Sequence, residues 1–103
     1  MDAHGTIYVS DHGNHSIRRV TPTDGVVMTL CGSRQCESGL ADGESVDARF
    51  KEPSGLALDM AGNLIVADCG NSCIRRVEPL TGRVITGTFK FVFHSNCGLQ
   101  IEN

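Results

Sequence analysis

The feature that most constrains this chain is a phrase that occurs twice. It reads DHGNHSIRRV at residues 11–20 and DCGNSCIRRV at residues 68–77. Around it, residues 2–29 align with 59–86 at a constant offset of 57 without a gap, and 14 of the 28 aligned pairs are identical. A repeat of this kind indicates stacked structural units, none of which can bury its apolar surface alone.

The second copy has the pattern of four short antiparallel strands. Apolar or β-branched runs alternate with turn signals, and the expected strands are 54–59, 64–68, 73–79 and 83–89. Asp59 can accept backbone N–H groups at the start of the first turn, and Gly62 can take a positive φ at its end. Pro79 cannot donate to a ladder and therefore ends the third strand. The pattern predicts one four-stranded meander sheet.

The first copy repeats this plan without its first strand. Its expected strands are 6–11, 16–22 and 26–32. In each copy an Asp-x-Gly-Asn corner joins the second strand to the third, and the repeated corner positions are Asp11, Gly13, Asn14, Asp68, Gly70 and Asn71. Since glycine and asparagine tolerate left-handed backbone, Gly70 and Asn71 are expected to adopt it.

A four-stranded sheet that is apolar on both faces is stabilised by stacking on similar sheets, and radial stacking gives a β-propeller. We expect an all-β propeller segment whose two sheets pack face to face. The expected divisions are a partial blade at 2–32, a connector at 33–53, a complete blade at 54–89 and a divergent tail at 90–103. Phe50 is the expected buried anchor of the connector.

These residues resemble NHL repeats, a β-propeller family. The resemblance is carried by EPSGLALDMAGNLIVADCGNSCIRRVEPLTGRVIT at 52–86, by its echo at 2–29 and by the connector GLADGESVDARFKEPSG at 39–55. It covers about 1.75 blades within residues 2–89, whereas NHL propellers usually contain about six blades. The resemblance implies a fragment or truncated product of a larger protein that binds other molecules.

The repeated arginines are the candidate binding residues, namely Arg18, Arg19, Arg75 and Arg76. Because adjacent residues in a strand point to opposite faces, each pair offers one guanidinium to each face of its sheet. The resemblance implies that such a basic stripe could meet an acidic protein partner or RNA phosphate, because some NHL propellers bind RNA and others bind protein. The alternative is internal pairing, in which Asp11 and Asp68 hold the arginines of the strands they precede.

Metal and catalytic chemistry have weaker support in the sequence. The residues considered are His12, His15, Cys69 and Cys73 at the corners, Cys31 and Cys36 on either side of the start of the connector, and Asp42, Glu44 and Asp47 in an acidic turn. None of these sets has the usual spacing of a zinc or EF-hand site, and no nucleophile elbow or phosphate loop is present. We expect no catalytic residue, metal or cofactor, and we expect the five cysteines to be mainly free thiols.

Charge and hydropathy limit the partners and the cellular location that we expect for this chain. A net charge of −3 is not typical of nonspecific nucleic-acid binding. No stretch approaches the ~20 apolar residues of a membrane span, and the first residues lack the pattern of a signal peptide, so we expect a cytoplasmic location and no membrane partner. Alternating Phe89, Phe91 and Phe93 in the segment 88–94 would form an apolar edge that favours self-association.

The sequence therefore predicts a noncatalytic interaction module that contributes NHL-type blades to a protein-binding platform. RNA binding through the repeated arginine pairs is one alternative. The other is a piece of a propeller hydrolase or lyase whose metal site lies mostly outside this chain.

Overall fold

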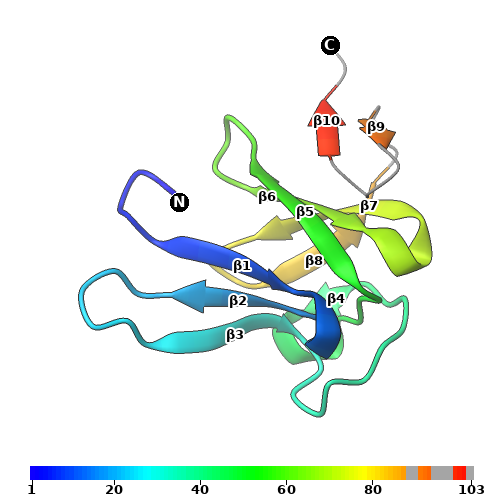
Figure 1. Ribbon diagram of the computed structural model, residues 1–103, viewed down its shortest axis with the longest axis horizontal. Coiled ribbons are helices and arrows are strands. Elements are labelled where there is room, and N and C mark those ends of the chain that lie inside the picture. Colours follow the sequence, from blue (N-terminus) through cyan, green and yellow to red (C-terminus); the bar gives the residue numbers. More distant parts are fainter. Residues whose placement is uncertain (88–90, 94–98, 102–103) are drawn as a thin grey trace.

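The computed structural model describes residues 1–87, 91–93 and 99–101, and its main body is two antiparallel sheets (Figure 1). The first sheet is a meander in the order β1-β2-β3. Its strands are β1 (Ile7–Asp11), β2 (Ser16–Val20) and β3 (Val27–Gly32). These are the three strands expected of the first copy, each shorter than its expected range by one or two residues. The short 3-10 turn η1 (His12–Asn14) joins β1 to β2.

The second sheet contains the four strands expected of the second copy and one more. In the order β4-β8-β7-β6-β5 its strands are β4 (Gly43–Glu44), β8 (Arg83–Thr86), β7 (Cys73–Glu78), β6 (Leu64–Asp68) and β5 (Pro53–Leu58). The additional strand β4 belongs to the connector and pairs with β8. Two further 3-10 turns are η2 (Ser45–Asp47) and η3 (Cys69–Asn71). The connector therefore adds a strand to the sheet that follows it in sequence.

The tail forms the strands β9 (Phe91–Phe93) and β10 (Leu99–Ile101), which pair with each other. Most of the expected association edge at 88–94, including Phe89, lies outside the described residues, and so does the end of the strand expected at 83–89. Within the part of the chain that the structure describes, no helix is long and apolar enough to cross a membrane.

The turn before β6 has the expected geometry and recurs before β1. Asp59 Oδ1 accepts the N–H groups of Ala61 and Asn63, each at 2.9 Å, and Gly62 has a φ of 85°. At the equivalent positions Asp2 accepts two backbone N–H groups and Gly5 has a φ of 82°. The roles predicted for Asp59 and Gly62 are confirmed.

The left-handed residue of each corner is not the expected one. The backbone turns left-handed at His15, with φ 55°, and at Ser72, with φ 53°. Gly70 and Asn71 belong instead to the 3-10 turn, which is right-handed, and the chain reverses at the residue that leaves this turn. The expectation of left-handed backbone at Gly70 and Asn71 was therefore wrong.

The two sheets pack face to face, as expected, and share one apolar core. Its buried residues come from the first sheet, the connector and the second sheet, and they are Ile17, Leu30, Cys31, Ala48, Phe50, Leu64, Val66, Val77 and Val84. Phe50 has no exposed surface, so its predicted role as the connector's anchor is confirmed. The connector is thus buried between the sheets as a third component of the core.

Close approach of the connector explains the glycine at position 70. A Cβ placed on Gly70 would lie 2.6 Å from the Lys51 carbonyl oxygen, and the Gly70 N–H donates to that oxygen at 2.8 Å. At the equivalent Gly13, no described atom lies within 4 Å of the Cβ position. The same repeat position is therefore filled in one copy and open in the other.

This difference predicts unequal effects of the same substitution. We expect Gly70→Ala to destabilise the fold by about 1–3 kcal/mol, because the backbone of Lys51 must move. Gly13→Ala is the matched control and is expected to stay within about 0.5 kcal/mol. Urea unfolding of the two variants measures both values. Equal losses in the two variants would show that the contact with Lys51 does not matter.

Candidate functional site

The four candidate arginines occupy four different environments. Arg75 is completely buried and its guanidinium lies over the Phe50 ring, with Cζ 4.9 Å from the ring centroid. Its Nη1 donates to Asp68 Oδ2 at 2.9 Å and its Nη2 to Asp42 Oδ1 at 3.0 Å. In this fold no partner molecule can reach the guanidinium of Arg75.

The corner of the second copy binds the main chain of the connector. Arg75 donates to the carbonyl oxygens of Arg49 and Ala41, each at 2.8 Å. The Asn71 side-chain amide donates to the Gly39 carbonyl oxygen at 2.8 Å, and Asp68 Oδ1 accepts the Lys51 N–H at 2.8 Å. The repeated Asp, Asn and Arg of this copy therefore hold the connector against the second sheet.

Asp42 links this cluster to the end of β8. Its Oδ1 accepts hydrogen bonds from Arg75 and from the Thr86 hydroxyl, the latter at 2.8 Å. Partial burial alone would raise the pKa of Asp42, but the Thr86 hydrogen bonds and the charge of Arg75 outweigh it and leave the pKa below its ordinary value. The expected acidic turn is thus partly tied to the fold through Asp42.

Arg18, the equivalent of Arg75, forms a smaller and more open pair. Its Nε donates to Asp11 Oδ2 at 3.0 Å, and Nη1 donates to the Thr29 hydroxyl. The Asn14 side-chain amide donates to the same Asp11 oxygen at 2.9 Å. These hydrogen bonds from Asn14 and Arg18 lower the pKa of Asp11, against a smaller opposing effect of desolvation.

The corner histidines contact the connector. The Glu52 N–H donates to His15 Nδ1 at 3.0 Å, and His12 Nε2 lies 3.7 Å from the Glu52 carboxylate. Among the described residues, no group of three or more His, Cys, Asp or Glu side chains is arranged to hold a metal ion.

The cysteines differ from one another. Cys31, Cys36 and Cys73 are free thiols, whereas Cys69 is disulfide-bonded, so the expectation of free thiols was wrong at that position. Burial raises the pKa of the Cys31 thiol to about 12, which keeps this side chain a protonated, apolar part of the core at neutral pH.

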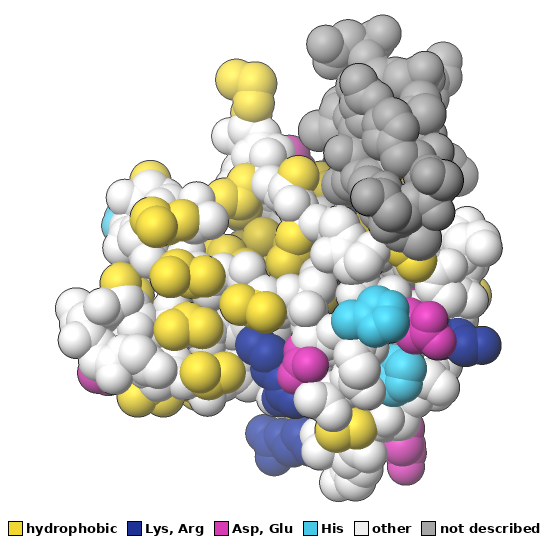
Figure 2. Space-filling model, in the orientation of Figure 1, with side chains coloured by type: hydrophobic (Ala, Val, Ile, Leu, Met, Phe, Trp, Pro, Cys, Tyr) yellow, Lys and Arg dark blue, Asp and Glu magenta, His cyan; other side chains and the backbone are white. Residues whose placement is uncertain are grey.

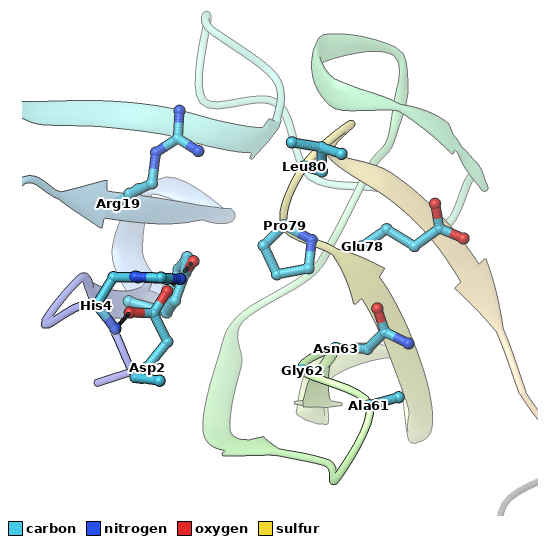
Figure 3. A pocket seen from close by; sticks show the side chains of 11 residues that line it. Asp2, His4, Arg19, Ala61, Gly62, Asn63, Glu78, Pro79 and Leu80 are labelled. Carbon is cyan, nitrogen blue, oxygen red and sulfur yellow. Dashed lines mark hydrogen bonds between the residues drawn. The ribbon is translucent and has the colours of Figure 1, made fainter.

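A pocket of about 550 Å³ opens where turns of the two sheets meet (Figure 3). Its lining residues are Asp2, Ala3, His4, Tyr8, Arg19, Ala61, Gly62, Asn63, Glu78, Pro79 and Leu80. In Figure 3, Arg19, His4 and Asp2 lie on one side, and Asn63, Glu78 and Pro79 lie on the other. The volume is in the range of small-ligand and peptide-side-chain sites.

Tyr8 binds the carboxylate of Asp2, the acidic residue of the turn before β1, in the lining of this pocket. The Tyr8 hydroxyl donates to Asp2 Oδ2 at 3.0 Å, and Asp2 Oδ1 already accepts the N–H groups of His4 and Thr6. Desolvation alone would raise the pKa of Asp2, but these hydrogen bonds lower it below its ordinary value. Burial and the bond to Asp2 raise the pKa of Tyr8. The carboxylate of Asp2 is therefore engaged within its own turn.

Arg19 is consequently the candidate arginine that is open to a ligand. In the second copy the equivalent Arg76 lies 3.9 Å from Asp59, and isoleucine occupies the position of Tyr8. In the first copy the side chain of Arg19 forms no hydrogen bond or ion pair with any residue in the described ranges. Sequence reasoning treated Arg19 and Arg76 alike, and the Tyr8–Ile65 difference within the repeat is the signal that separates them.

Comparison with known proteins matches part of this chain to a repeat family and to several relatives. Residues 50–77 match the NHL repeat. The chain is 40% identical over 74 residues to Protein SUPPRESSOR OF QUENCHING 1, chloroplastic, of Arabidopsis thaliana. The aligned region covers 72% of this chain and 7% of that protein. It is 31% identical over 91 residues to human NHL repeat-containing protein 2, covering 82% of this chain and 12% of that protein.

Solved structures agree on the fold. A Bacteroides thetaiotaomicron structural genomics protein of unknown function superposes with a TM-score of 0.70 at 31% identity, over 82% of this chain and 21% of the other. An auxiliary nutrient binding protein from the same organism gives a TM-score of 0.64 at 23% identity, over 87% of this chain and 24% of the other. The chain thus spans between 7% and 24% of the length of these four proteins.

Proposed function

Because this chain is built from NHL-type propeller repeats, we propose that it is a noncatalytic interaction module that binds a protein segment in the pocket between its two sheets. The observation that carries the proposal is Arg19, a cation without an ion-pair partner among the described residues, placed in that pocket. Recognition by propellers commonly uses loop tips on a rigid frame, and this pocket is lined largely by turns.

The lining favours a segment with one carboxylate beside an apolar side chain. Arg19 would hold the carboxylate, and Pro79 and Leu80 would contact the apolar group. The carboxylates of Asp2 and Glu78 lie in the same lining and repel a polyanion such as RNA. Protein is therefore the partner that we propose in preference to RNA.

The test uses a defined peptide in place of the unknown partner. The probe is the capped peptide acetyl-Gly-Leu-Glu-Phe-Gly-amide, titrated into the chain and followed by NMR at Arg19 Nε–H. We expect saturable shifts and roughly tenfold weaker binding for Arg19→Gln, the size of one lost charge-assisted hydrogen bond. Arg83→Gln, at an exposed position in β8, is the matched control and should bind like the unchanged chain.

Two results would count against the proposal. One is equal binding by the Arg19→Gln and Arg83→Gln variants, which would place the peptide elsewhere. The other is preferential binding of poly(U) with a steep dependence on salt, which would favour RNA.

A further inference from the structure

The turn before β1 and the turn before β6 place an aspartate in the same position. The offset of 57 equates Asp2 with Asp59. In each turn the aspartate Oδ1 accepts two backbone N–H groups at 2.9 or 3.0 Å, and the glycine of the turn has nearly the same positive φ, 82° at Gly5 and 85° at Gly62. The two turns therefore have the same geometry, and each leaves the second carboxylate oxygen, Oδ2, for another partner.

The partner of Oδ2 differs between the copies. In the second copy Asp59 Oδ2 lies 3.9 Å from Arg76 Nε, and the residue opposite this arginine on the neighbouring strand is Ile65, which has no side-chain donor. In the first copy Tyr8 occupies the position of that isoleucine, and its hydroxyl donates to Asp2 Oδ2 at 3.0 Å. The turn carboxylate that lies beside the arginine in one copy is therefore held by a tyrosine in the other.

Tyr8 and Arg19 lie on the face of the first sheet that is turned toward the second sheet. They are directly opposite each other on β1 and β2, and Tyr8 packs against the core between the sheets. Ile7 and Val9 alternate with Tyr8 and so lie on the other face, where they are exposed. Figure 2 shows hydrophobic side chains gathered over β1, β2 and β3. In Figure 3, Asp2 lies on the same side of the pocket as Arg19, so the aspartate and the arginine share one wall.

We propose that Tyr8 is the positioning residue of the Arg19 pocket. Its hydroxyl holds Asp2 in the turn and so leaves the guanidinium of Arg19 available for the carboxylate of a partner. Without that hydroxyl, Asp2 Oδ2 would pair with Arg19, as the equivalent residues do in the second copy. The pocket would then be closed by the protein's own carboxylate in the place of the ligand. This inference rests on the proposed function, because it concerns the same pocket.

The second copy also indicates the chemical class of ligand that suits this arginine. There the equivalent arginine lies beside a carboxylate. A carboxylate of the partner competes with that of Asp2 for the same donors, and its apparent affinity rises when Asp2 is held elsewhere. His4 and Glu78 also line the pocket, but the Tyr8 hydroxyl is the group that donates to Asp2 Oδ2. Tyr8 therefore acts on the ligand through Asp2 and Arg19.

The first test needs no ligand. The pKa of the Asp2 carboxyl group is measured by NMR in the unchanged chain and in Tyr8→Phe, each with and without Arg19→Gln. In the Tyr8→Phe background we expect Arg19→Gln to raise the pKa of Asp2 by roughly 0.5 or more, because an ion pair is lost. In the unchanged background the same substitution should raise it by at most about 0.2. Equal rises in the two backgrounds would overturn the inference.

The second test uses the peptide acetyl-Gly-Leu-Glu-Phe-Gly-amide. We expect Tyr8→Phe to weaken its binding roughly threefold, less than Arg19→Gln does, because the arginine is present but partly paired. Asp2→Asn keeps the acceptor for the turn and removes the competing charge. Its gain in binding should be roughly threefold larger in the Tyr8→Phe background than in the unchanged background, where it only removes repulsion. An equal gain in both backgrounds would contradict competition by Asp2.

The controls separate this inference from the proposed function. Asp59→Asn is the equivalent change in the second copy and should leave peptide binding as it is in the unchanged chain. Tyr8→Ile, which introduces the residue of the second copy, repeats both tests if Tyr8→Phe does not fold. If the unchanged chain does not bind the peptide, the proposed function fails and the pKa test still decides the role of Tyr8. If the peptide binds the unchanged chain and Tyr8→Phe equally, the proposed function stands and the inference is overturned.

Discussion

Replacing Arg75 by methionine is expected to destabilise the fold by about 3–5 kcal/mol, because it leaves the buried carboxylate of Asp68 without its cation. It also removes the donors for the carbonyl oxygens of Ala41 and Arg49, so the connector loses part of its attachment. Urea unfolding followed by circular dichroism measures the loss.

Arg18→Met is the matched control, since Arg18 occupies the equivalent position on β2. Its pair with Asp11 is partly exposed and screened by solvent, and we expect a loss below about 1 kcal/mol. The double variant Asp68→Asn with Arg75→Met should recover part of the loss, because no unpaired carboxylate then remains buried. Similar losses at Arg18 and Arg75 would show that burial does not set the strength of this pair.

Phe50→Ala is expected to cost about 3–5 kcal/mol. Phe50 is fully buried between the sheets, so truncation leaves a cavity in the main core and also removes the ring beneath Arg75. Leu40→Ala changes an exposed apolar residue of the same connector and should stay within about 0.5 kcal/mol. Thermal or urea unfolding compares the two.

A third variant separates the two contributions of the Phe50 ring. Phe50→Leu keeps most of the volume but not the cation–π contact, so it should recover most of the loss and remain below the unchanged chain. If Phe50→Ala and Leu40→Ala unfolded alike, the connector would not be part of the core.

Local features made the strands predictable from the sequence. β6 has the expected bounds of 64–68, because a β-branched run lies between a turn ended by Gly62 and the corner at Asp68. The face-to-face packing also follows from sequence, since neither copy can bury both of its apolar faces alone.

What sequence reasoning missed depends on contacts between distant residues. Strand β4 has only two residues in a polar segment, and it exists because β8 offers an edge. Arg75 is buried because the connector passes over it, and the amino-acid sequence of β7 alone does not show this contact. Likewise, Arg19 and Arg76 are identical in the repeat and differ through the residue opposite each on the neighbouring strand, Tyr8 or Ile65.

The corner of the second copy binds the connector mainly through the connector's main-chain atoms. Asp68, Asn71 and Arg75 bond to backbone groups of Gly39, Ala41, Arg49 and Lys51. Backbone groups are the same whatever side chain a residue carries. Most side chains of the connector, apart from anchors such as Phe50, can therefore change without loss of these bonds. This arrangement would allow repeats from different proteins to be recombined, in evolution or by design, while each repeat keeps its own recognition loops.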